Sequence, residues 1–117
     1  MTANSSDFNA FILEQLQAIP VLRSKPFFGG TGLTTHGLQF AMLMGNTLYF
    51  VVDDKTRPAY EALGGVSFSY QTAKKKVNVK KYFSVPAHVI EEEDELMVWA
   101  RTSIQIAKQA DQRKVKP

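Results

Sequence analysis

Two kinds of spacing alternate along this chain: apolar residues at helical intervals, and apolar residues at every second position. Helical spacing appears in three segments. The first covers residues 5–20, where a serine can cap the helix and a proline ends it. The second is shorter and covers residues 53–65, and the third runs from about Glu92 to Arg113. The pattern therefore predicts three helices.

The alternating segments lie between these helices. From Val21 the pattern becomes extended, and Leu38, Phe40, Met42 and Met44 give the following strand one strongly apolar face. Further strands are predicted for residues 48–52, 66–71 and 77–85, with turns at Gly45-Asn46 and Lys74–Lys76. The predicted order is helix, three strands, helix, two strands, helix. Hairpins joined by a helix favour an α+β fold, a two-layer α/β sandwich with a five-stranded, mainly antiparallel sheet.

Composition is consistent with one globular domain. The 117 residues are 44% hydrophobic and 21% charged, and they include no cysteine, which excludes disulfides and thiolate metal sites. No apolar stretch approaches the roughly 18 residues of a membrane-spanning helix, and the first residues show no signal-peptide pattern. We expect a single cytoplasmic domain over residues 1–117, with its core at about residues 7–112 and short disordered tails.

The charges are segregated along the chain, although the net charge is only +3. Five of the fourteen cations fall within eight residues, next to Tyr82 and Phe83. Interleaved cations and aromatic rings can bind a nucleic-acid backbone or another partner, whereas an ordinary solvated hairpin also carries lysines. Both interpretations stay open for this candidate surface, which consists of Lys74, Lys75, Lys76, Lys80 and Lys81.

No residue pattern points to catalysis, a metal or a cofactor. His36 and His88 are 52 positions apart and lack the spacing of metal ligands or of a nucleophile–base pair. The acidic run Glu91–Glu95 fits the N-terminus of the last helix, where the helix dipole favours negative charge. We therefore predict no catalytic, cofactor-binding or metal-binding residues.

The segment Phe28-Gly29-Gly30-Thr31-Gly32 superficially resembles a phosphate-binding loop. It lacks the Lys-Ser/Thr of a P-loop and leads into a strand rather than a helix. The glycines are better explained by positive φ angles at a bend or bulge, or by close backbone packing. Phe28, Gly29, Gly30 and Gly32 are thus predicted to be structural.

Trp99 is predicted to be structural as well. It lies on the inner stripe of the last helix, between Leu96 and Ala100, and we expect its indole to cover the Leu38/Phe40/Met42 face or its edge.

Six short motifs, in order and spacing, make roughly residues 13–110 similar to a known family. They are Phe27–Leu33, Gly37–Leu43, Leu48–Phe50 with Asp53, Phe68–Tyr70, Tyr82–Pro86, and Leu96 with Trp99–Arg101. Together they resemble the N-terminal domain of the TfoX/Sxy competence-regulator family.

Three departures from the family pattern stand out. Phe27 replaces a methionine, and the turn Thr72–Lys75 lacks the usual glycine. The chain also stops at Pro117, ahead of the helical C-terminal domain of two-domain members, so that a stand-alone protein and a fragment both stay open.

The resemblance implies an α-β(3)-α-β(2)-α fold and a role in natural competence in bacteria. Fuller members of the family are thought to act with the cyclic-AMP receptor protein at competence-gene promoters, without being enzymes. We therefore expect a non-catalytic regulatory domain, monomeric or weakly dimeric, that binds a transcription-related protein. The alternative is direct nucleic-acid binding through the Lys74–Lys81 hairpin, with no membrane association in either case.

Overall fold

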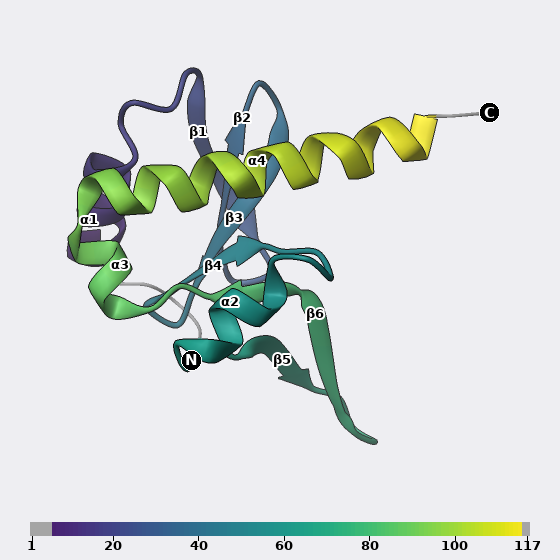
Figure 1. Ribbon diagram of the computed structural model, residues 1–117. Helices are drawn as coiled ribbons and strands as arrows, with labels where there is room; N and C mark the ends of the chain where they lie inside the picture. The colour runs from purple at the N-terminus through teal and green to yellow at the C-terminus, as the bar shows by residue number, and fades with distance from the viewer. Residues whose placement is uncertain (1–5, 116–117) are drawn as a thin grey trace.

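The chain folds into one antiparallel sheet with helices on one of its two faces (Figure 1). The structure is a computed structural model that describes residues 6–115, and the side chains of residues 6–112. In chain order the elements are α1 (Ser6–Gln15), β1 (Leu22–Phe27), β2 (Gly30–Thr35), β3 (Leu38–Met44), β4 (Thr47–Val51), α2 (Arg57–Ala62), β5 (Ser67–Gln71), β6 (Lys76–Ser84), α3 (Ala87–Glu91) and α4 (Glu93–Val115).

Three two-residue turns fold β1 to β4 into a meander. They are Phe28-Gly29, His36-Gly37 and Gly45-Asn46, and both residues of each turn have positive φ. Positive φ at both positions is the pattern of the type I′ turn, whose twist matches that of the flanking strands. After α2, the long strand β6 returns beside β4 and carries β5 on its outer side, so that the strand order is β1-β2-β3-β4-β6-β5.

The α+β fold and the antiparallel sheet agree with the sequence, but the predicted count of five strands was wrong. The sheet in the described residues has six, because the Phe28-Gly29 turn divides residues 22–35 into a hairpin of two strands. These glycines were predicted to form a bend or bulge, or to allow close packing, within one extended segment. The short helix α3, which is separated from α4 by an extended backbone at Glu92, was not predicted.

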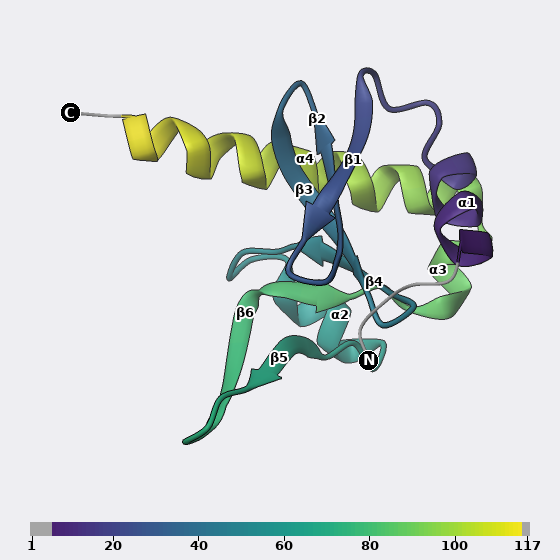
Figure 2. The same cartoon turned by 180° about the vertical axis from the view of Figure 1, so that it is seen from behind.

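The hydrophobic core lies between the sheet and α4, which crosses one face of it (Figures 1 and 2). Phe40 and Phe50 are fully buried there, with ring centroids 6.2 Å apart. They pack beneath α4 together with Leu33, Leu43, Leu48, Leu96 and Ala100.

A β-bulge in β3 changes which residues share a face. The register shifts between Leu33 and Thr34 opposite β3, so that Phe40 turns toward α4 while Met42 and Met44 reach the opposite face. The prediction that Leu38, Phe40, Met42 and Met44 form a single apolar face was therefore wrong. Both faces of this strand are apolar instead.

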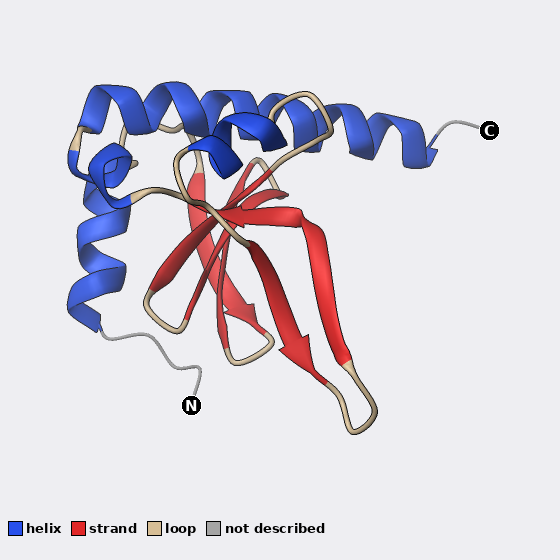
Figure 3. Cartoon of the chain, turned by 60° about the horizontal axis from the view of Figure 1, so that its bottom comes forward, coloured by secondary structure: helices blue, strands red, loops and turns tan. Residues whose placement is uncertain are grey.

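No helix of the described residues covers the face opposite α4. Figure 3 shows the helices gathered on one side of the strands, with the β5–β6 hairpin diverging from the rest of the sheet. None of the helices in the described part of the chain has the length and apolarity that crossing a membrane requires. The predicted disordered tails fall mainly on residues 1–5 and 116–117, which lie outside the described residues.

Candidate partner-binding surface

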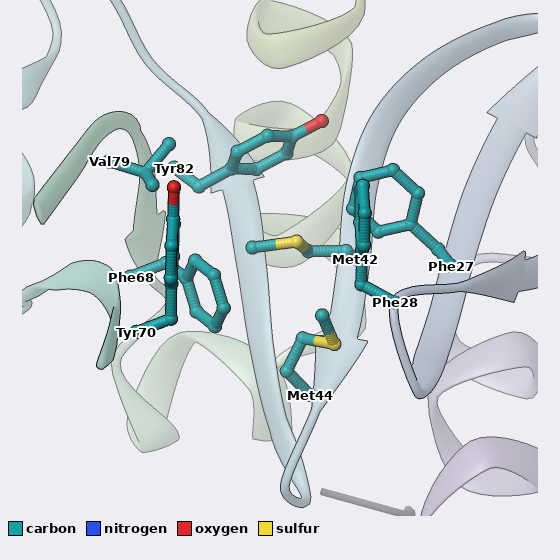
Figure 4. A pocket seen from close by; sticks show the side chains of 8 residues that line it. All are labelled: Phe27, Phe28, Met42, Met44, Phe68, Tyr70, Val79 and Tyr82. Carbon is teal, nitrogen blue, oxygen red and sulfur yellow. The ribbon is translucent and has the colours of Figure 1, made fainter. Parts of the chain in front are cut away.

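A groove of about 480 Å³ lies on the helix-free face of the sheet, between the β1–β2 hairpin and the β5–β6 hairpin (Figure 4). We call it the aromatic groove. Six of its eight lining side chains are hydrocarbon or thioether, and the other two are tyrosines. The lining residues are Phe27, Phe28, Met42, Met44, Phe68, Tyr70, Val79 and Tyr82.

One wall is formed by the adjacent residues Phe27 and Phe28. Their rings meet edge to face with centroids 4.7 Å apart, and Phe28 is 83% exposed. Phe28 also has φ of 46°, a left-handed conformation that a bulky residue adopts only with strain. Asparagine is preferred at this turn position, before the Gly29 whose φ is 82°. Neither burial nor backbone preference explains a phenylalanine at position 28, and this indicates a use at the surface.

The floor consists of Met42 and Met44 of β3 (Figure 4). Met44 can pack here because residue 30 has no side chain. A Cβ on Gly30 would collide with the Met44 sulfur and with the Leu43 carbonyl. Thioether side chains are flexible and polarisable, so this floor can adapt to apolar groups of different shape.

The opposite wall is formed by Phe68 and Tyr70 of β5 with Val79 and Tyr82 of β6 (Figure 4). Tyr70 is 49% exposed. Phe68 is held by an edge-to-face contact with Tyr49, with centroids 5.4 Å apart.

Tyr82 is fixed in this wall by a hydrogen bond from Gln39, whose Nε2 donates to the phenol oxygen at 3.1 Å. Gly32 makes room for that arrangement, since a Cβ there would lie 2.6 Å from Gln39 Oε1. Burial raises the pKa of Tyr82, while the hydrogen bond from Gln39 opposes this shift. The environment of this wall thus disfavours the charged phenolate.

The predicted lysine surface lies on the β5–β6 hairpin, and all five lysines are exposed. Lys74 and Lys75 occupy the turn, which Thr72 closes without a glycine. The Thr72 hydroxyl accepts hydrogen bonds from the backbone N–H groups of both lysines and donates one to the Lys75 carbonyl at 2.9 Å. Lys81 lies beside the aromatic groove, with its Nζ 5.8 Å from the centre of the Tyr82 ring.

The other residues weighed for chemistry lie apart from this groove. His36 is exposed in the β2–β3 turn and His88 is exposed on α3, while Glu91–Glu95 are exposed around the start of α4. Among the described residues, no three His, Asp or Glu side chains come together as a metal site would require.

Trp99 lies on the helix side of the sheet and is partly buried. Its indole meets the Tyr60 ring of α2 edge to face, with centroids 4.6 Å apart, and thereby joins α2 to α4. Tyr60 itself is buried, and its hydroxyl lies 3.5 Å from the Ser103 hydroxyl. Burial raises the pKa of Tyr60 to about 12, although the contact with Ser103 opposes the shift.

We expect this shift to make the domain less stable in alkali. Above pH 10 an unfolded Tyr60 loses its proton while the folded one keeps it until about pH 12, so that stability falls as the pH rises. The loss due to Tyr60 is about 2 kcal/mol by pH 12. Chemical denaturation from neutral pH to pH 12 would measure it, and Tyr60→Phe should remove this part of the decline. An equally steep decline in the variant would contradict the assignment.

The aromatic groove was not predicted from the sequence. Alternation suggested that Phe68 and Tyr70 share a face, but it could not show that this face lacks a covering helix. The one available signal was Phe28, a large apolar residue directly before the glycine of a tight turn. Phe28 was predicted only to be a structural residue of the glycine motif.

The fold and the groove define the class of protein: an α+β domain with one helix-covered sheet face and one open aromatic face. Residues 14–107 match the family model of the TfoX N-terminal domain. This match covers most of the chain, which therefore belongs to the TfoX N-terminal domain family. A comparison with curated proteins found no match.

Proposed function

We propose that this chain is a non-catalytic regulatory domain that binds a transcription-related protein in the bacterial cytoplasm. The observation that carries the proposal is the aromatic groove, with Phe28 and Tyr70 exposed at its walls. Contiguous exposed apolar surface with rigid aromatic side chains is typical of protein-binding sites.

The chemistry of the groove supports binding rather than catalysis. Its polar side-chain groups are the hydroxyls of Tyr70 and Tyr82, and the second of these already accepts a hydrogen bond from Gln39. A catalytic site would need a nucleophile, or an acid and a base, directed at one point. The groove lining includes no such group.

Membership of the TfoX N-terminal domain family suggests the identity of the partner. We propose that the domain acts as a monomer or weak homodimer on a protein that works at competence-gene promoters, with the cyclic-AMP receptor protein as the first candidate.

A gel-shift experiment tests this proposal. The purified chain is added to a competence-promoter fragment with and without the cyclic-AMP receptor protein and cyclic AMP. We expect the chain to produce a complex that migrates more slowly than the receptor–promoter complex, and only when the receptor protein is present. No change under any condition would contradict the proposed partner, whereas a shift without the receptor protein would favour direct nucleic-acid binding.

A further inference from the structure

Negative charge is confined to the helical part of the fold, whereas cations occur in both the helices and the strands. Each of the chain's eleven acidic residues lies in a helix, between α3 and α4, or in the loop that leads into α2. The strands and the β5–β6 turn contain cations and no acid. These cations are Arg23, Lys25, Lys74, Lys75, Lys76, Lys80 and Lys81.

Two of these cations flank the aromatic groove on opposite sides. Lys25 lies two residues before Phe27 on β1, hence on the same side of that strand, and Lys81 lies beside the Tyr82 ring. Both lysines are exposed. The only ion pair among the described residues joins Arg57 and Asp54, so neither lysine is neutralised within this part of the chain. The groove is thus apolar along its floor and positive at both margins.

The backbone around the groove favours a helical occupant. The groove lies on the sheet face, where the inner strands β2, β3, β4 and β6 have partners on both sides. The two free strand edges belong to β1 and β5, at the outer sides of the groove walls. An extended peptide lying along the floor over β3 would not reach them, and its own buried amides would be left unpaired. A helix satisfies its own backbone and presents apolar side chains at intervals of three and four residues.

The lining favours apolar side chains over nucleobases. Bases can stack on exposed aromatic rings, but a base inserted into the groove would find only two tyrosine hydroxyls for its hydrogen-bonding edge, and one of them already accepts a hydrogen bond from Gln39. The flexible Met42 and Met44 floor suits the insertion of aliphatic or aromatic side chains.

We propose that the aromatic groove binds an amphipathic helix of the protein partner, with acidic residues along both borders of its apolar stripe. The apolar stripe packs between the exposed rings of Phe28 and Tyr70, above the buried side chains of Met42 and Met44, and the acidic residues face Lys25 and Lys81. This inference rests on the proposed function and specifies the chemistry that the partner presents.

Fluorescence anisotropy with designed peptides tests the inference on the full chain. The probe is a labelled helical peptide of about 18 residues, long enough to fold, with leucine and phenylalanine on one stripe and glutamate at its borders. The matched peptide carries lysine in place of glutamate, and labelled single-stranded oligo-dT serves as the nucleic-acid probe. We expect the acidic peptide to bind about tenfold or more tightly than the basic one at low salt, with the difference shrinking as salt is added.

The Phe28→Asn variant tests the contribution of Phe28 to binding without weakening the fold. Asparagine before Gly29 is favoured in a type I′ turn, so the variant should be at least as stable as the parent. It should bind the acidic peptide about tenfold more weakly, because an aromatic wall of the groove is lost. Lys25→Glu with Lys81→Glu should weaken binding by a similar factor. The matched control, Arg101→Glu with Lys108→Glu on the exposed side of α4, makes the same change in net charge and should leave binding unchanged.

Every other result would contradict a specific part of the inference. Equal binding of the acidic and basic peptides would contradict the proposal that the occupant carries acidic residues. Binding unaffected by Phe28→Asn would show that the peptide does not bind in the aromatic groove. Tighter binding of oligo-dT than of either peptide would show that the groove binds a nucleic acid and not a helix. If no peptide binds, yet the parent and Phe28→Asn both join the promoter complex, the inference fails while the proposed function stands.

Discussion

Gly30→Ala is expected to destabilise the domain by about 3 kcal/mol, an unusually large effect for the addition of one methyl group. The new Cβ would collide with the Met44 sulfur and with the Leu43 carbonyl. The methionine can move, but the carbonyl belongs to the backbone of a strand paired on both sides. Relief therefore requires β2 and β3 to separate locally. Urea denaturation of the variant and the parent would measure the difference.

Gly37→Ala is the matched control for Gly30→Ala. Gly37 has φ of 78°, and nothing lies within 4 Å of an added Cβ. Its replacement should cost only the strain of a left-handed alanine, about 1 kcal/mol. The two substitutions thus separate the energetic cost of a steric collision from the cost of an unfavourable backbone conformation. Equal destabilisation by the two substitutions would show that Gly30 is not required for close packing.

Trp99→Ala is expected to cost about 2–4 kcal/mol. Complete truncation of a buried tryptophan costs about 3–5 kcal/mol, and the lower range reflects the partial exposure of this indole. The cost arises from loss of the contact with Tyr60, which joins α2 to α4. We also expect Tyr60 to become more exposed in the variant, so its pKa should move back from about 12 toward the ordinary value. Chemical denaturation and ultraviolet titration of the tyrosines would measure the two effects.

Val98→Ala provides the comparison on the same helix. Val98 precedes Trp99 and is 59% exposed, so its truncation should change stability by less than about 0.5 kcal/mol. If Trp99→Ala were equally mild, the indole would have no structural role, and a role in binding would become the better explanation.

The sequence determined most of the elements and their class. Helical spacing identified α1, α2 and α4, and alternation identified the strands from β3 onward, because both patterns report directly which side of an element is buried. The order of hairpins and helices was enough to predict an α+β domain. The motifs around Phe27–Leu33 and Leu96–Arg101 predicted the family, which the match over residues 14–107 confirms.

Tertiary structure decided the number of strands and the faces of the sheet. The Phe28-Gly29 turn uses a residue that is unfavourable for positive φ, so turn preferences gave no reason to divide residues 22–35. The bulge opposite Leu33 and Thr34 moved Phe40 away from the face of Met42, a change that strict alternation could not reveal.

The aromatic groove was also decided by tertiary structure. Apolar alternation shows that a strand face avoids water, but it does not show what covers that face. Only the packing of α4 on the other side leaves the groove over Met42 uncovered by a helix of the described residues, with Phe28 and Tyr70 exposed at its walls, because one layer of helices can cover only one face of a sheet.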